Sequence, residues 1–74
     1  MNKSATSKIG SRLRAERERC EYSLRDVENL TGFSRQLVCE YEHGVRRVPA
    51  EKLQILSELY GFSIEWILDG VEQC

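Results

Sequence analysis

The chain has 74 residues, of which 41% are hydrophobic and 31% are charged, a balance that predicts one small globular domain rather than a disordered chain. No apolar run approaches the roughly 20 residues of a membrane-spanning helix, and no secretory signal is recognisable, so we expect a cytoplasmic protein. One histidine and three cysteines without a CxxC pair argue against an enzyme, a metal site, a disulfide framework or a cofactor. The composition favours a binding module, and nothing in it indicates a small-molecule ligand.

The formal net charge is −1, which argues against a protein that coats nucleic acid indiscriminately. The charge is unevenly distributed, however. Residues 1–47 carry ten basic and seven acidic side chains, whereas residues 48–74 carry one basic and five acidic side chains. A basic front could steer a polyanion to one face, and chance clustering on solvated helices would give the same counts.

The first predicted element is a helix over residues 8–20, with Ser7 as its N-cap and its end at Glu21–Tyr22. One side of this helix repeats at four-residue spacing, at Ile9, Leu13 and Arg17. Basic side chains also gather here, and we expect some of them to contact phosphate. They are Lys8, Arg12, Arg14 and Arg19.

The second predicted helix covers residues 24–31. Ser23 followed three residues later by Asp26 is a capping-box-like start. Gly32 can adopt the left-handed conformation that ends a helix in a tight turn. The apolar positions of this helix are Val27 and Leu30.

The third predicted helix begins after Ser34, which is a suitable N-cap, and ends at Gly44. Its apolar side has the three- to four-residue spacing of a helix, at Leu37, Val38 and Tyr41. His43 lies at its C-terminal end, where we expect the ring to interact with exposed carbonyl groups rather than with a metal.

The last two predicted helices cover residues 50–60, after Pro49, and residues 64–69, capped by Ser63 and closed by Gly70. No segment alternates as a strand would, so the predicted fold class is all-α with five helices. The predicted domain spans residues 1–74, with a flexible N-terminus over 1–6 and a C-terminal tail over 70–74.

The second and third predicted helices, joined by a short turn that contains glycine, form a helix-turn-helix pattern. From Ile9 to Gly70 the sequence resembles the phage repressor and Cro family of helix-turn-helix domains, which has the lambda-repressor-like fold. The residues that carry the resemblance are Ile9-Gly10-x-x-Leu13-x-x-x-Arg17, Ser23-x-x-x-Val27-x-x-x-Thr31-Gly32-Phe33-Ser34-x-x-x-Val38-x-x-Tyr41-Glu42-x-Gly44, Pro49-x-x-x-Leu53-x-x-Leu56 and Gly61-Phe62-Ser63-Ile64-Glu65-Trp66-Ile67-Leu68-Asp69-Gly70.

Two positions depart from the family pattern. Leu24 stands where the family often has a glutamine that contacts a phosphate or a neighbouring recognition side chain, so one expected DNA contact is absent. Glu28 stands where the family favours a small residue at the crossing of the two helices. Glu28 therefore needs room or a partner, which could be Arg25 or Arg35.

The outward face of the third helix is the predicted base-reading surface. Arginine suits guanine, glutamine suits adenine, and glutamate accepts a hydrogen bond from cytosine N4. The alternative is an ordinary solvated helix face. Because an acid faces an anionic groove here, Glu40 would have to contribute through specificity or by pairing with Arg35. The predicted base-reading residues are Arg35, Gln36, Cys39 and Glu40, and Cys39 is expected to be a free thiol.

Contacts to the DNA backbone are expected from helix starts and from the loop after the third helix. The resemblance implies that this loop follows the backbone, although arginines in any loop can be simply solvated. Amide groups at a helix N-terminus can also hold a phosphate. The predicted backbone-contacting residues are Ser23, Arg25, Ser34, Arg46 and Arg47.

Arg17 continues the apolar side of the first helix, so its side chain must face the core, where a guanidinium needs an acid. The resemblance implies that its partner is Glu42, which would join the first helix to the third.

The last helix offers more large apolar side chains than one inward face of a short helix can cover. Exposed apolar surface commonly marks association sites. We therefore expect a homodimer formed through this helix and the tail, with Trp66, Ile67 and Val71 as contacts, and the resemblance implies the same region.

The resemblance implies a sequence-specific transcriptional regulator of double-stranded DNA, of the phage or prophage repressor type, that binds a palindromic operator as a homodimer. Restriction–modification controllers and antitoxin-type autoregulators share this architecture. An alternative of another class is a protein-interaction module that keeps the fold without binding DNA, which Leu24, Glu28, Glu40 and the net charge favour.

Overall fold

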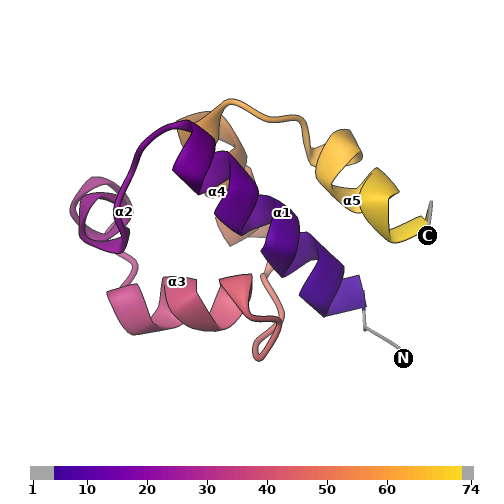
Figure 1. Cartoon of the computed structure of the whole chain (residues 1–74), viewed down its shortest axis with the longest axis horizontal. Helices are drawn as coiled ribbons and strands as arrows, with labels where there is room; N and C mark the ends of the chain where they lie inside the picture. Colours follow the sequence, from indigo (N-terminus) through magenta and orange to yellow (C-terminus); the bar gives the residue numbers. More distant parts are fainter. Residues whose placement is uncertain (1–4, 73–74) are drawn as a thin grey trace.

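The computed structural model describes the backbone of residues 5–72 and the side chains of residues 8–68. The described residues form five α-helices and no strand, as Figure 1 shows. This confirms the predicted all-α class, and the arrangement is consistent with a lambda-repressor-like fold. The helices are α1 (Ala5–Arg19), α2 (Leu24–Thr31), α3 (Arg35–Glu42), α4 (Ala50–Tyr60) and α5 (Ile64–Glu72).

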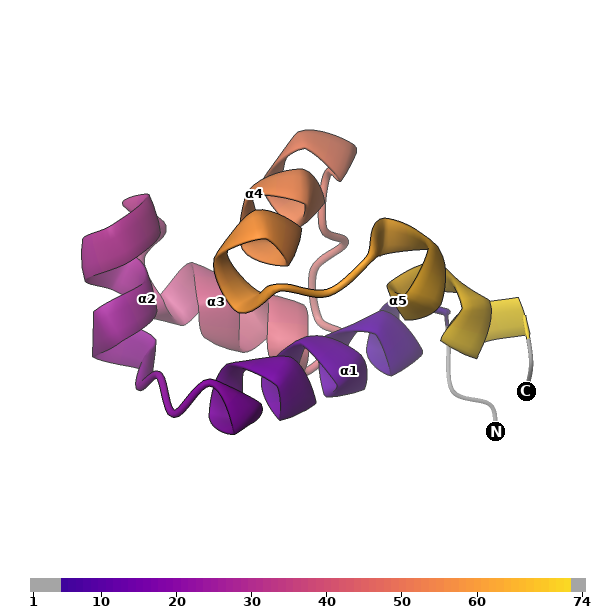
Figure 2. The same ribbon diagram turned by 90° about the horizontal axis from the view of Figure 1, so that it is seen from above.

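The central element is α1, which packs against α3 on one side and α5 on the other. α2 packs against α3, and α4 packs against α5 (Figure 2). Apolar residues from all five helices form one contiguous buried core. The buried core residues are Leu13, Val27, Val38, Tyr41, Leu53, Leu56, Tyr60 and Ile67.

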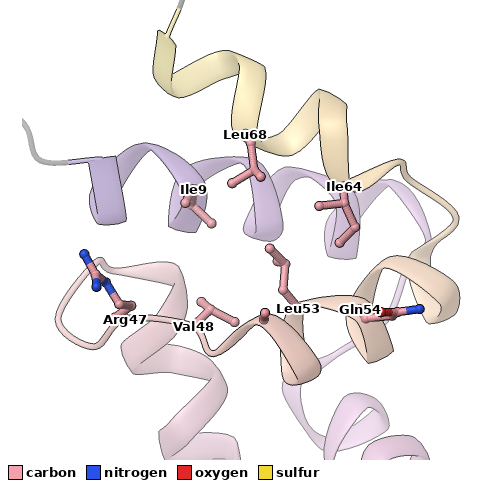
Figure 3. Close-up of a pocket in the computed structure, with 8 residues that line it drawn as sticks. Ile9, Arg47, Val48, Leu53, Gln54, Ile64 and Leu68 are labelled. Carbon is pink, nitrogen blue, oxygen red and sulfur yellow. The ribbon is translucent and has the colours of Figure 1, made fainter.

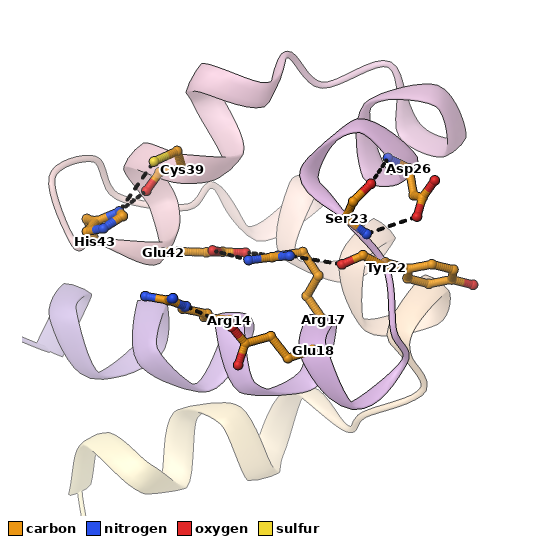
Figure 4. A network of polar contacts seen from close by, with 9 residues as sticks. All are labelled: Arg14, Arg17, Glu18, Tyr22, Ser23, Asp26, Cys39, Glu42 and His43. Carbon is orange, nitrogen blue, oxygen red and sulfur yellow. Dashed lines mark hydrogen bonds and ion pairs between the residues drawn. The ribbon is translucent and has the colours of Figure 1, made fainter.

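Local capping chemistry starts and ends α2 as the sequence predicts. The Ser23 hydroxyl accepts a hydrogen bond from the Asp26 amide at 3.0 Å, and the Asp26 carboxylate accepts one from the Ser23 amide at 2.9 Å (Figure 4). Gly32 follows with φ of 87°, in the left-handed region where glycine avoids steric strain. The capping box is therefore confirmed.

Serines also begin the third and fifth helices. The Ser34 hydroxyl accepts from the Leu37 amide at 3.1 Å, and the Ser63 hydroxyl accepts from the Trp66 amide at 3.0 Å. Both N-caps are confirmed, because each hydroxyl satisfies an amide that the helix itself leaves without a partner.

The predicted start of α1 and the predicted end of α5 are wrong. α1 begins at Ala5, within the segment predicted as flexible, so Ser7 lies inside the helix rather than at its cap. α5 continues through Gly70 to Glu72 instead of stopping at Asp69. Glycine within a helix costs about 1 kcal/mol relative to alanine and does not by itself end one.

Gly10 lies where the backbone of α1 approaches the C-terminal end of α3. A Cβ atom at this position would lie 2.5 Å from the Glu42 carbonyl oxygen and 2.8 Å from its carbon, and it would also overlap the Tyr41 carbonyl oxygen. Only a residue without a side chain lets the two backbones approach in this way. The spacing of the two helices therefore depends on Gly10.

Candidate nucleic-acid interface

The turn between α2 and α3 is held by a side-chain hydroxyl as well as by glycine. Thr31 Oγ1 donates to the Val27 carbonyl at 2.7 Å and accepts from the Phe33 amide at 3.0 Å. Val27 and Val38 are fully buried beneath this turn. Hydrogen bonds of Thr31 and packing of the two valines thus hold α2 and α3 together. The face of α3 that points away from Val38 stays at the surface.

Arg35 and Gln36 are both exposed on this outer face. The Arg35 Nε lies 3.0 Å from Glu28 Oε1, so the partner of Glu28 is Arg35 rather than Arg25. Both side chains stay at the surface, which explains how α2 carries an acid near its crossing with α3. Leu24, the other departure from the family pattern, packs against the core instead of facing solvent.

Glu40 is the centre of a second polar cluster. Its Oε1 accepts from Arg46 Nε at 2.8 Å, and its Oε2 accepts from Gln36 Nε2 at 3.3 Å. The hydrogen bond from Arg46, followed by that from Gln36, lowers the pKa of the Glu40 carboxyl, and Glu40 in turn raises the pKa of Arg46. Pairing with Arg35 was one of two alternatives for Glu40, and the structure pairs Glu40 with Arg46 and Arg35 with Glu28 instead.

The backbone of the loop is attached to the same residue. The amides of Val45 and Arg46 both donate to the Glu40 carbonyl oxygen, at 3.0 and 3.4 Å, and Gly44 makes the turn with φ of 75°. These bonds hold the start of the loop against the C-terminal end of α3. Arg46 is consequently positioned by its main chain as well as by its carboxylate partner.

Cys39 and His43 lie one turn apart at the same end of α3. His43 Nδ1 donates to the Cys39 carbonyl at 2.8 Å, which confirms the predicted interaction with an exposed carbonyl (Figure 4). The Cys39 sulfur lies 3.4 Å from the same nitrogen and is partly exposed.

The residues predicted to contact the DNA backbone are all exposed: Ser23, Arg25, Ser34, Arg46 and Arg47. The two serine hydroxyls accept bonds from cap amides, so each keeps its own proton to donate. Among the residues whose side chains are described, Arg25 and Arg47 take part in none of the recorded ion pairs. The two adjacent arginines thus differ: Arg46 is paired with Glu40, and Arg47 forms no ion pair with a described side chain.

Arg47 lies at the edge of an apolar groove of about 340 Å³ between α1, α4, α5 and the loop that precedes α4 (Figure 3). Sequence reasoning did not find this groove, because its walls come from four separate segments. The lining residues are Ile9, Arg47, Val48, Ala50, Leu53, Gln54, Ile64 and Leu68.

Arg17 and Glu42 form a bidentate ion pair beneath the interface (Figure 4). Arg17 Nε lies 2.7 Å from Glu42 Oε2, and Nη2 lies 3.1 Å from Oε1. The third guanidinium nitrogen donates to the Tyr22 carbonyl at 2.9 Å. The side chains are only 11% and 3% exposed, and the bond from Glu42 raises the pKa of Arg17. α1 is thereby joined both to α3 and to the segment that leads into α2.

The other arginines of α1 have partners within the domain. The Arg12 guanidinium lies 4.2 Å from the centre of the Trp66 ring and donates to the Trp66 carbonyl. Arg14 pairs with Glu18, and Arg19 bonds to Glu16 and to the Tyr60 carbonyl. Arg12 and Arg19 therefore attach α1 to the C-terminal part of the domain, a role that their charge alone did not indicate.

The predicted dimer contacts do not share one environment. Ile67 is fully buried in the core, so its assignment to an interface is wrong. Trp66 and Leu68 on either side are 39% and 41% exposed. The number of apolar residues in α5 does not indicate which of them faces α1. The side chain of Val71 lies outside the described residues.

Among the described side chains, His, Cys, Asp and Glu do not gather in groups of three that could bind a metal ion. None of the helices described is both long enough and apolar enough to cross a membrane.

The comparisons with known proteins agree with this geometry. Residues 8–66 match the family described as "Helix-turn-helix domain". Over 60 residues the chain is 37% identical to a "Putative HTH-type transcriptional regulatory protein" of Methanothermobacter thermautotrophicus (strain Delta H), covering 81% of this chain and 19% of that relative. The chain thus spans about a fifth of that relative's length. No solved structure gave a significant match. The chain belongs to the helix-turn-helix domain family.

Proposed function

We propose that this chain is a sequence-specific transcriptional regulator that places α3 in the major groove of double-stranded DNA. The observation that carries the proposal is the exposed outer face of α3, which bears Arg35 and Gln36 and is followed by a loop with two exposed arginines. An eight-residue helix is about 12 Å long, which suits a major groove about 12 Å wide. The name of the Methanothermobacter relative, which describes a transcriptional regulatory protein, also supports this proposal.

Within this proposal the exposed side chains divide into two classes. Arg35, Gln36, Cys39 and Glu40 face the bases, where arginine reads guanine and glutamine reads adenine. Ser23, Arg25, Ser34, Arg46 and Arg47 contact phosphates and fix the position of α3 without reading sequence.

We further propose that the regulator is a repressor of the phage or prophage type that binds a palindromic operator as a homodimer. One helix-turn-helix reads only a few base pairs, and two related by a two-fold axis would place their α3 helices about 34 Å apart, one turn of DNA. Trp66 and Leu68 support association through α5, because both are partly exposed on one short helix.

Selection of bound sites from a pool of random duplexes tests the proposal directly. We expect enrichment of a palindromic motif with two half-sites one helical turn apart. A motif without symmetry would support DNA binding and contradict the dimer. If no sequence is enriched, the chain is instead a protein-interaction module that has kept the fold.

Substitutions should separate the two classes of contact. Arg35→Ala or Gln36→Ala should weaken operator binding by about 1–3 kcal/mol and relax one position in each half-site. Arg47→Ala should weaken all duplexes alike and reduce the salt dependence of log K by about 1. Titration of operator and random duplexes at several salt concentrations measures both effects. Arg35 is no base reader if its removal weakens both duplexes equally.

The dimer proposal predicts that Leu68→Glu lowers self-association. A charge on this partly exposed side chain disfavours its burial in an interface. Sedimentation at high micromolar concentration measures the effect. Ile55→Glu is the matched control, because Ile55 is equally exposed but lies on α4. A monomeric parent would contradict the dimer, and equal association of both variants would place the interface elsewhere.

A further inference from the structure

Two acidic residues of the candidate interface, Glu28 and Glu40, each form an ion pair with an arginine. Glu28 pairs with Arg35 at 3.0 Å, and Glu40 pairs with Arg46 at 2.8 Å. Each pair joins two elements of the interface, α2 to α3 in the first case and α3 to the following loop in the second. In the free protein, therefore, two of the arginines that face the proposed DNA are already neutralised.

Glu40 does more than neutralise one charge. Its two oxygens bind different partners, Arg46 on Oε1 and Gln36 on Oε2. One carboxylate thus engages a phosphate-contacting side chain and a base-reading side chain at the same time. Its partners are largely at the surface, where a competing group of the DNA can reach them.

We propose that Glu40 is a specificity-determining residue. In the free protein it binds Arg46 and Gln36, and this lowers the affinity for non-matching DNA, because only a cognate site offers the carboxylate and its two partners new hydrogen bonds in exchange. This inference rests on the proposed function. On random DNA, Arg46 must leave a carboxylate to reach a phosphate, and the carboxylate is left facing an anionic groove. On a cognate site the carboxylate accepts a hydrogen bond from cytosine N4, so the acid gains a partner as the arginine gains a phosphate.

This arrangement also accounts for a helix-turn-helix domain with a net charge of −1. Phosphate contacts supply most of the affinity for random sequences, and each contact steepens the salt dependence of log K by about 0.9. A paired arginine contributes little of this affinity, because its pairing must be broken first. Acids within the interface therefore reduce sequence-independent binding more than they reduce cognate binding.

The test compares Glu40→Gln with the parent on a random duplex and on the selected operator. Glutamine keeps the shape of the side chain and leaves the main-chain bonds from Val45 and Arg46 in place, so the variant should fold. We expect random-duplex affinity to rise about tenfold at low salt, with a salt dependence of log K steeper by about 0.9. Operator affinity should rise less, and the preference for cytosine at the contacted position should weaken.

The control variant is Glu58→Gln, which removes the same charge from an exposed position on α4 that forms no ion pair with a side chain of residues 8–68. Equal gains for both variants would show an effect of net charge alone and would overturn the inference. Urea unfolding of each variant confirms that both are folded under the binding conditions.

A double-mutant cycle tests the pairing itself. Arg46→Gln should weaken random-duplex binding less in the parent than in the Glu40→Gln background, where it should remove most of the gain. Equal effects in both backgrounds would overturn the inference. Its failure is distinguishable from failure of the proposed function: in the first case the parent still selects a motif, whereas in the second neither parent nor variant binds any duplex.

Discussion

Replacing Arg17 by alanine should lower the free energy of unfolding by about 3–5 kcal/mol, the range expected when one partner of a buried ion pair is removed. The variant leaves the Glu42 carboxylate, only 3% exposed, without its two guanidinium bonds. It also leaves the Tyr22 carbonyl without its donor. Burial of an unpartnered carboxylate, rather than loss of attraction, supplies most of the destabilisation.

Urea unfolding measures this change, with Arg14→Ala as the matched control. Arg14 pairs with Glu18 on the same helix, but both side chains are largely exposed, so the control should lose about 1 kcal/mol or less. A loss under about 1 kcal/mol for Arg17→Ala would contradict the importance given to the buried pair.

The helix caps could be predicted from the sequence, because each one depends on residues only a few positions apart. The capping box at Ser23 and Asp26 and the left-handed Gly32 need no knowledge of the rest of the chain. Arg17 was predictable for a related reason: a charge on the buried side of a helix requires an acid, and the resemblance supplied Glu42 as the partner.

The arrangement of the candidate interface could not be read in the same way. Arginine and glutamine on the outer face of α3 were expected, but the partners of those side chains depend on how α2 and the loop lie against α3. Glu40 therefore pairs with Arg46 instead of Arg35. Whether these side chains read bases remains a prediction, which the binding experiments above address.

α5 shows a second limit of sequence reasoning. Four large apolar residues in a short segment correctly indicate that some apolar surface stays exposed, but the count cannot say which residue faces inward. That choice follows from the rotation of α5 against α1, which places Ile67 in the core and leaves Trp66 beside Arg12. A charged substitution at Ile67 would consequently report on folding rather than on association.

Gly10 illustrates the same dependence on tertiary packing, and Gly10→Ala has the second large expected effect. In an isolated helix this change would stabilise by up to about 1 kcal/mol, since alanine is the better helix former. Here the new Cβ would overlap carbonyl groups of Tyr41 and Glu42. Backbone atoms cannot rotate away as a flexible side chain can, so α1 and α3 must separate.

We expect a net loss of about 1–3 kcal/mol in the free energy of unfolding, the range measured for overpacked cores. Separation of the helices would also lengthen the bonds between Arg17 and Glu42, because Glu42 carries both the overlapped carbonyl and the paired carboxylate. The double variant Gly10→Ala/Arg17→Ala should therefore lose less than the sum of the single variants. Ser11→Ala, an exposed neighbour on α1, controls for helix propensity. If Gly10→Ala stabilises the protein as that control does, the close crossing of α1 and α3 does not limit the size of this residue.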